Sequence, residues 1–178
     1  MRIIAGTLRG RRLAVPPGDR IRPTLDRVRE ALFSSLGDRV EGARFLDLFA
    51  GSGANGMEAL SRGASSAVFV DDHAASLKCI RQNLAALGLE GKATVVRYSL
   101  PEGISRLDGA FDLIYADPPY DFGQYESLLE HIQQEGCLQE GGSVIIEHRS
   151  KISLPAEAAG LSLDRQRRYG NATLSVYA

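Results

Sequence analysis

The chain has 178 residues, of which 44% are hydrophobic and 24% are charged, and its formal net charge is −1 at pH 7. This length suits one domain with a sizeable core, and the composition excludes a disordered or fibrous chain. No apolar run is long enough for a signal sequence or a membrane span, so we expect a cytoplasmic protein with no membrane partner. Cys79, Cys137 and the three histidines form neither a disulfide framework nor a ligand cluster, and we expect no metal.

Positive charge gathers in the first thirty residues. They hold eight arginines against three acidic residues, a net charge of +5, so the remainder carries −6. Residues 1–14 predict two short strands around a basic turn, and apolar spacing after Thr24 predicts a helix that ends at Gly37. We expect residues 1–40 to be an appendage to a single domain at residues 41–178. A basic arm suits contact with phosphate, but a surface hairpin without a partner explains the charge equally well.

From Arg44 onward, apolar strand patterns alternate with helical ones, which predicts a parallel sheet with helices on both faces. A Gly170-Asn171 turn between two further strand patterns predicts a hairpin at the carboxyl end. The result is an α/β fold with a seven-stranded, mostly parallel sheet, one antiparallel strand, and a last helix that is short or missing. The predicted strands are 45–49, 67–71, 93–97, 111–116, 143–148, 161–169 and 172–177, and the predicted helices are 55–62, 74–87, 101–107 and 125–135.

A glycine-rich turn follows the first of these strands. Gly51, Gly53 and Gly56 fit the pattern G-x-G-x-x-G, in which missing side chains let a ligand approach the backbone. Asp71 ends the next strand, where its carboxylate can accept a hydrogen bond from a ribose hydroxyl. Dinucleotides and S-adenosylmethionine both use this geometry, and the glycines do not separate them. Asp47 favours the methyl donor, because a carboxylate there suits the ammonium group of its methionine part and opposes a pyrophosphate.

The sequence Asp117-Pro118-Pro119-Tyr120 follows the fourth strand of the sheet. Ligands of open parallel sheets bind beyond the carboxyl ends of the strands, so this loop should face the same crevice as the glycine turn. An amino group on an aromatic base is a poor nucleophile because its lone pair is delocalised into the ring. The Asp117 carboxylate and the Pro118 carbonyl can accept its protons and balance the charge that develops during attack on a methyl group. Tyr120 can stack on the base.

These motifs resemble those of known methyltransferases. DLFAGSG (47–53) and DPPY (117–120) resemble the amino-methyltransferases that act on adenine N6, cytosine N4, guanine N2 and protein glutamine. Four further segments are similar to bacterial 16S rRNA (guanine(966)-N2)-methyltransferases of the RsmD type: MRIIAGTLRGRRLAVP (1–16), RPTLDRVREALFSSLG (22–37), GMEALSRGA (56–64) and RRYGNATLSVY (167–177). The resemblance spans nearly the whole chain. It implies a Rossmann-like methyltransferase fold with an amino-terminal hairpin and helix, S-adenosylmethionine as donor, and a guanine of 16S rRNA or the assembling small subunit as acceptor.

The resemblance also implies a role for each site residue, and we expect a monomer. Where such enzymes commonly carry an acidic residue near the adenine amino group, this chain has Ser99, which is uncharged. Transfer would be a direct displacement that yields S-adenosylhomocysteine. The expected catalytic residues are Asp117, Pro118 and Tyr120, the expected cofactor contacts are Asp47, Gly51, Gly53, Asp71, Ser99 and Thr24, and the expected RNA contacts are Arg9, Arg11, Arg12, Arg22 and Arg27.

Three other functions explain part of the pattern. An NAD-dependent oxidoreductase accounts for the glycine turn but leaves Asp117–Tyr120 without a role. An RNA-binding module without catalysis accounts for the basic arm but not for two motifs at strand ends. A glutamine methyltransferase is the nearest rival, although it would typically carry Asn in place of Asp117 and lack the arginine arm.

Overall fold

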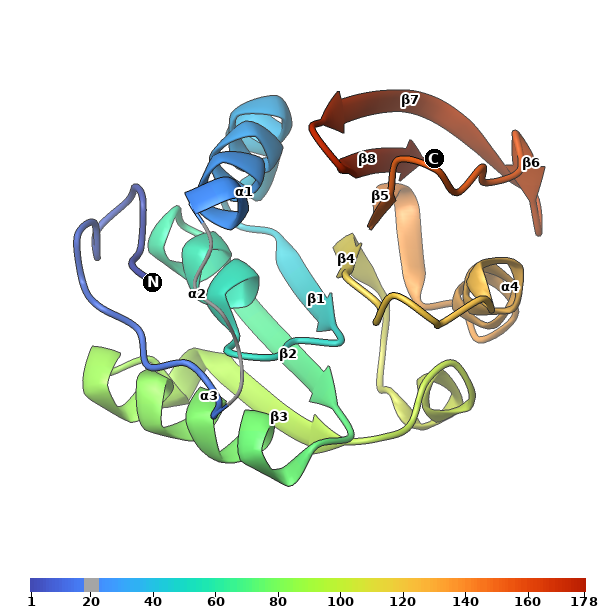
Figure 1. The fold of residues 1–178 in the computed structure, drawn as a ribbon. Helices are drawn as coiled ribbons and strands as arrows, with labels where there is room; N and C mark the ends of the chain where they lie inside the picture. Colours follow the sequence, from blue (N-terminus) through green and yellow to red (C-terminus); the bar gives the residue numbers. More distant parts are fainter. Residues whose placement is uncertain (18–22) are drawn as a thin grey trace.

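The computed structural model describes residues 1–17 and 23–178 of the chain (Figure 1). Arg22 lies outside the described residues, as does the side chain of Thr24. One sheet runs through the molecule in the strand order β3-β2-β1-β4-β5-β8-β7-β6. Its strands are β1 (Arg44–Leu48), β2 (Ser66–Asp71), β3 (Ala93–Arg97), β4 (Phe111–Ala116), β5 (Leu138–Arg149), β6 (Glu157–Ala158), β7 (Leu161–Tyr169) and β8 (Ala172–Tyr177).

Strands β1 to β5 are parallel, β8 runs antiparallel to β5, and β7 runs antiparallel to β8. The predicted count of seven strands was wrong, because the two-residue strand β6 adds an eighth at the edge and is also antiparallel to its neighbour β7. No helix lies between β5 and β7, as the weak helical pattern there had suggested. The carboxyl-terminal hairpin has the predicted two-residue turn, with Tyr169 paired to Ala172.

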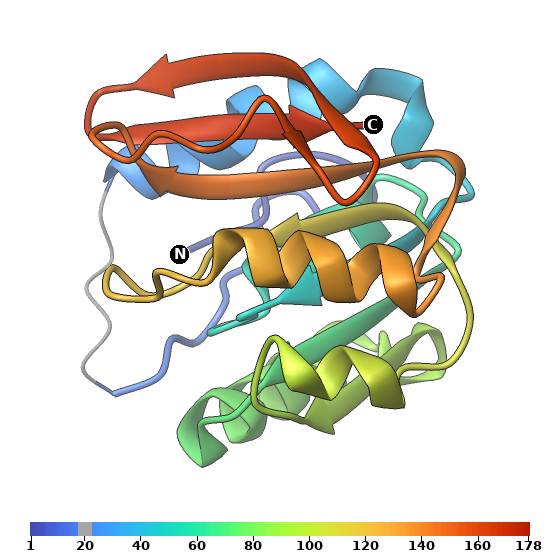
Figure 2. The same cartoon turned by 90° about the vertical axis from the view of Figure 1, so that its right-hand side faces the viewer.

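Helices cover both faces of the sheet. On one face lie α1 (Pro23–Leu36), α2 (Ala54–Ser61) and α3 (Ala74–Leu87), whose apolar side chains share one core cluster. On the other face lie α4 (Tyr125–Gln134) and the short helix η3 (Glu102–Arg106), which share a second cluster. Figure 2 shows α4 in front of the sheet and α1 behind it. The short helices η1 (Gly37–Val40) and η2 (Glu90–Lys92) complete the fold. No described helix combines the length and apolar character needed to cross a membrane.

Strand β5 is much longer than its sequence pattern indicated. β5 begins at Leu138 rather than at Ser143, because Leu138 pairs with Phe111 of β4 ahead of an irregularity in the register. Residues 139–141 within this extension are polar or glycine and exposed, so their chemistry carried no strand signal. Pairing with a neighbouring strand, rather than an apolar pattern, extends the strand here.

The amino-terminal segment forms a hairpin, but not the two strands that were predicted. Its strand pairing is a single bridge between Arg2 and Arg12. Three backbone hydrogen bonds span the hairpin, among them Ile3 N–H to the Arg11 carbonyl and Leu13 N–H to the Met1 carbonyl. The hairpin lies against α2 and α3 (Figure 1) and buries Ile3 and Leu13 in the core. Since its main-chain groups also bond to the body of the domain, a longer two-stranded ladder does not form.

Candidate active site

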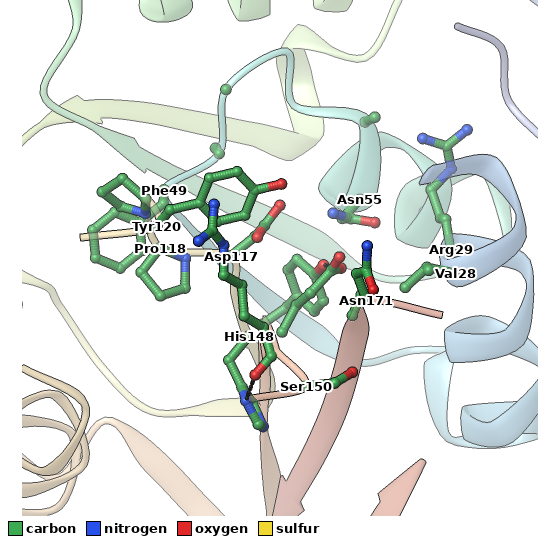
Figure 3. Close-up of a pocket in the computed structure, with 18 of the residues that line it drawn as sticks. Val28, Arg29, Phe49, Asn55, Asp117, Pro118, Tyr120, His148, Ser150 and Asn171 are labelled. Carbon is green, nitrogen blue, oxygen red and sulfur yellow. Dashed lines mark hydrogen bonds between the residues drawn. The ribbon is translucent and has the colours of Figure 1, made fainter. Parts of the chain in front are cut away.

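A cavity of about 1150 Å³ opens at the carboxyl ends of β1, β4 and β5. The start of α2, part of α1 and the β7–β8 turn form its other walls, so elements from the whole length of the chain meet there. Figure 3 shows the side chains of Asn55, Asp117 and Asn171 directed toward one shared space. The two loops expected to face one crevice do so, because Gly51 and Ser52 of the first and Asp117, Pro118 and Tyr120 of the second all line this cavity.

The three glycines of the turn have different reasons to be glycine. Gly53 has φ +77° and precedes α2, and a Cβ there would lie 3.0–3.3 Å from core side chains. At Gly56 a Cβ would lie 2.3 Å from the Phe69 ring, so its absence allows α2 to pack on β2. Gly51 has φ +55°, and a Cβ there would meet no atom within 4 Å. Gly51 is therefore the glycine whose backbone faces open space that a ligand can occupy.

Asp47 and Asp71 hold the backbone of this turn. The buried Asp47 carboxylate accepts a hydrogen bond from Gly56 N–H at 2.8 Å. Burial, together with the nearby negative charge of Asp71, raises the pKa of Asp47 to about 8, although the hydrogen bond from Gly56 opposes this shift. Asp71 accepts from Gly51 N–H and His73 N–H, each at 2.9 Å, so both of its oxygens are engaged. Neither Asp47, Asp71 nor Gly53 is among the residues that line the cavity.

Phe49 connects the glycine turn to the Asp-Pro-Pro-Tyr loop. It has φ +58°, an uncommon conformation for a residue with a side chain. Its ring packs edge-on against Phe122, with 5.0 Å between ring centroids. Phe122 in turn contacts Tyr125 at the start of α4, with 5.4 Å between centroids. The strained backbone is thus held by packing between the two loops, which is typical of a functional site.

Asp117, Pro118 and Tyr120 extend from the end of β4 into the cavity. Asp117 N–H lies 3.4 Å from the Leu48 carbonyl, which keeps the start of the loop beside β1. Asp117 is exposed and Pro118 is buried, whereas Tyr120 is 59% exposed. The Arg149 guanidinium lies over the Tyr120 ring, 3.9 Å from its centroid. A base that stacks on Tyr120 would therefore use the other face of the ring or displace Arg149.

The sequence analysis did not identify a hydrogen-bonded pair of polar residues in the cavity wall. Tyr115, on β4, donates a hydrogen bond of 2.5 Å to Oε2 of Glu147, on β5, and both residues line the cavity. Burial raises the pKa of Glu147, and the hydrogen bond from Tyr115 opposes that shift. Burial also raises the pKa of Tyr115 well above its usual value. The sequence did carry a signal for Glu147, because it is an acidic residue inside the apolar strand pattern VIIEH. Asp47 stands out in the same way inside FLDLF.

Other predicted contacts are not among the residues that line the cavity. Ser99 is exposed beyond β3 and is not among the lining residues. The predicted RNA contacts Arg9, Arg11, Arg12 and Arg27 are exposed, and Arg11 also donates to the Ala86 carbonyl at 2.7 Å.

Two further charged clusters lie at or near the cavity. A basic rim that the sequence reasoning did not identify lines it, formed by Arg149, Lys151 and Arg168. Among the described residues, one group could offer three ligands to a metal: Asp71, Asp72 and His73. Asp72 and His73 of this group are exposed, and Oδ1 of Asp72 lies 2.6 Å from Nδ1 of His73.

Known proteins share this architecture. Ribosomal RNA small subunit methyltransferase D of Escherichia coli is 37% identical over 178 residues, which is 99% of this chain and 89% of that protein. The solved structure of yhhF from Escherichia coli has a TM-score of 0.86 and 36% identity, covering 99% of this chain and 96% of that one. SMU.776, solved in complex with S-adenosylhomocysteine, shares the fold with a TM-score of 0.70 at 17% identity, over 89% of this chain and 50% of that one.

The strand order, the site and these relatives define the chain as a methyltransferase with the α/β fold of S-adenosylmethionine-dependent enzymes. More particularly, the chain belongs to the family described as conserved hypothetical protein 95, whose model matches residues 1–178, and to the RsmD family of rRNA small subunit methyltransferases. The family indicated by the sequence motifs is thereby confirmed.

Proposed function

We propose that this protein transfers a methyl group from S-adenosylmethionine to the exocyclic N2 of a guanine in 16S rRNA, in the cytoplasm. The observation that carries the proposal is the meeting of two loops in one cavity. Gly51 presents open backbone on one side, and Asp117 presents a carboxylate on the other. The name of the Escherichia coli relative supports the choice of small-subunit rRNA as the acceptor.

The residues present fit the methyl donor. Open space beside Gly51 allows the donor to lie against the backbone of the turn, with Asp47 and Asp71 behind it. When bound, S-adenosylmethionine supplies an electrophilic methyl group and leaves as S-adenosylhomocysteine. We assign the ammonium group of the donor to the side of Asp47 and its ribose to Asp71. Both assignments need a carboxylate that already bonds to backbone N–H groups to accept one more hydrogen bond, which its remaining lone pairs allow.

Asp117 and Pro118 act on the amino group that is methylated. Their acceptor oxygens take hydrogen bonds from its two protons, which favours a pyramidal nitrogen with a localised lone pair. As positive charge develops on the nitrogen, the carboxylate stabilises it and is placed to take the departing proton. Because the loop is held by Leu48 and Phe49, these acceptors need little reorganisation during the reaction.

RNA contact is assigned to two basic surfaces. The hairpin places Arg9, Arg11 and Arg12 on the exterior of the domain. The basic rim of Arg149, Lys151 and Arg168 lies at the cavity itself. Phosphates on either side of an unstacked guanine can be bound by the rim while the hairpin binds more distant backbone.

Product analysis tests the proposal. Small ribosomal subunits from cells that lack the protein are incubated with the purified enzyme and S-adenosylmethionine carrying a deuterated methyl group, and the rRNA nucleosides are analysed by mass spectrometry. We expect labelled N2-methylguanosine at a single position. Label on another base or on a ribosomal protein, or no labelling at all, would contradict the proposal. Free 16S rRNA in a parallel reaction shows which form of the substrate the enzyme uses.

A further inference from the structure

Two carboxylates leave the sheet side by side at the cavity. Ala116, the last residue of β4, is paired with Ile146 of β5, and the residue that follows each of them is acidic, Asp117 and Glu147 respectively. The two differ in their surroundings, because Asp117 is exposed and Glu147 is 8% exposed. The mechanism proposed above uses Asp117 and gives Glu147 no role.

Glu147 is built into the wall rather than left on a surface. Tyr115 donates to its Oε2, and among the described residues this is the hydrogen bond that fixes the carboxylate. Glu147 also lines the cavity, and its second oxygen, Oε1, is not among the buried side-chain atoms that lack a partner, so we take Oε1 to face the cavity. Burying a carboxylate costs free energy unless it is hydrogen-bonded, so a buried acid beside a binding space calls for a donor from the ligand.

The atoms next to the reacting amino group differ among the bases. In adenine and cytosine the ring nitrogens beside the exocyclic amino group carry lone pairs and accept hydrogen bonds. In guanine, one ring neighbour of the N2 amino group is N1, which carries a proton and donates. An ionised carboxylate is an acceptor only. A carboxylate adjacent to Asp117 therefore attracts the N1–H of guanine and repels the corresponding lone pair of adenine or cytosine.

From this geometry we infer that Glu147 is the residue that selects guanine, by accepting a hydrogen bond from N1–H while Asp117 and Pro118 hold the N2 amino group. Tyr115 acts as a positioning residue, because its hydrogen bond directs the Glu147 carboxylate. This inference rests on the proposed function, since it assumes that guanine N2 is the acceptor. It adds the basis on which guanine is distinguished from the other bases that carry an amino group.

A base substitution matched to a side-chain substitution tests the inference. Small-subunit rRNA is ligated from fragments so that the methylated position carries either guanine or 2-aminopurine, and it is assembled into subunits. 2-Aminopurine keeps the N2 amino group but has a lone pair at N1 in place of the proton. Single-turnover kcat/KM is measured on both substrates for the wild type, Glu147→Gln, Tyr115→Phe and the control Glu140→Gln, which alters an exposed residue of the same strand.

The wild type should prefer guanine over 2-aminopurine by about 10²-fold or more, since a site built to bond a substrate N–H rejects an analogue that lacks it. Glutamine can donate to a lone pair at N1, so Glu147→Gln should reduce this preference by about tenfold or more. It should do so by losing rate on guanine while keeping or gaining rate on 2-aminopurine. Tyr115→Phe should weaken the preference less, and Glu140→Gln should leave it unchanged.

The outcomes separate this inference from the proposed function. If the wild type methylates no guanine N2, the proposed function fails. If it methylates guanine and Glu147→Gln lowers both rates equally, Glu147 is only structural and the inference alone is overturned. The absence of O6 in 2-aminopurine affects all variants alike, so the change in preference between wild type and Glu147→Gln reports on N1.

Discussion

Replacing Glu58 by alanine tests how the amino-terminal hairpin is held on the domain. Glu58 is fully buried on α2, and its carboxylate accepts hydrogen bonds from Ile4 N–H at 2.8 Å and Ala5 N–H at 3.0 Å. It also pairs with Arg62 at 2.8 Å and lies 3.8 Å from the buried Arg29. Removing one partner of a buried ion pair costs about 3–5 kcal/mol. The two freed N–H groups add little if the hairpin moves away and hydrates them.

We therefore expect Glu58→Ala to lower the free energy of unfolding by about 3–5 kcal/mol, or the melting temperature by roughly 6–20 °C. Because the loss begins at the hairpin, the amides of Ile4 and Ala5 should exchange with solvent about 10²-fold faster or more. Urea unfolding and hydrogen exchange measure the two effects. Glu130→Ala, at an exposed helical glutamate, is the matched control and should stay within about 0.5 kcal/mol of the wild type. Unchanged stability together with unchanged exchange at both amides would refute this reasoning.

Three further predictions concern the donor and the RNA. Asp71→Ala should weaken S-adenosylhomocysteine binding in calorimetry while largely sparing single-turnover transfer at saturating donor, and unchanged affinity would refute the ribose assignment. Replacing Arg9, Arg11 and Arg12 together by alanine should make RNA binding less dependent on salt. The slope of the logarithm of the binding constant against the logarithm of the salt concentration should fall in magnitude by about 0.7–0.9 per lost phosphate contact, and an unchanged slope would mean that these arginines bind no phosphate. The pKa of Asp47 is raised to about 8, so its carboxyl group is largely protonated at pH 7. When the ammonium group of S-adenosylmethionine binds beside it, Asp47 should release up to one proton to the solvent. Calorimetry in buffers of different ionisation enthalpy detects that release, which should vanish above about pH 9; no release at pH 7 would place the ammonium elsewhere.

The regular part of the fold was predictable from the sequence because short-range patterns determine it. The strands 93–97 and 111–116, the helix 74–87 and the carboxyl-terminal hairpin have the predicted bounds. Elements whose extent depends on a distant partner were not predictable in this way. β5 is extended by pairing with Phe111, and the edge strand β6 exists because it pairs with β7.

The sequence predicted that the two loops meet at one cavity, but it did not indicate which residues form the other walls of that cavity. Asp117 and Gly51 stand in motifs at strand ends, where their neighbours in sequence indicate their role. Glu147 lies in the cavity wall, and Tyr115, to which it is hydrogen-bonded, belongs to another strand. Arg29 counted toward the basic arm, yet it is buried beside Glu58, a partner 29 positions away that no local pattern reveals. The division at residue 40 and the monomeric state stay predictions.

The measurement that tests the central claim most directly is the single-turnover rate of Asp117→Ala with saturating donor and small subunits. Loss of one preorganised acceptor costs on the order of 3 kcal/mol in the transition state, about 10²-fold in rate. Asp121→Ala, at an exposed acidic residue of the same loop, serves as the matched control. We expect Asp117→Ala to be slower by about 10²-fold with nearly unchanged affinity for S-adenosylhomocysteine, and Asp121→Ala to keep the wild-type rate. A wild-type rate in Asp117→Ala would contradict the assignment of methyl transfer to this loop.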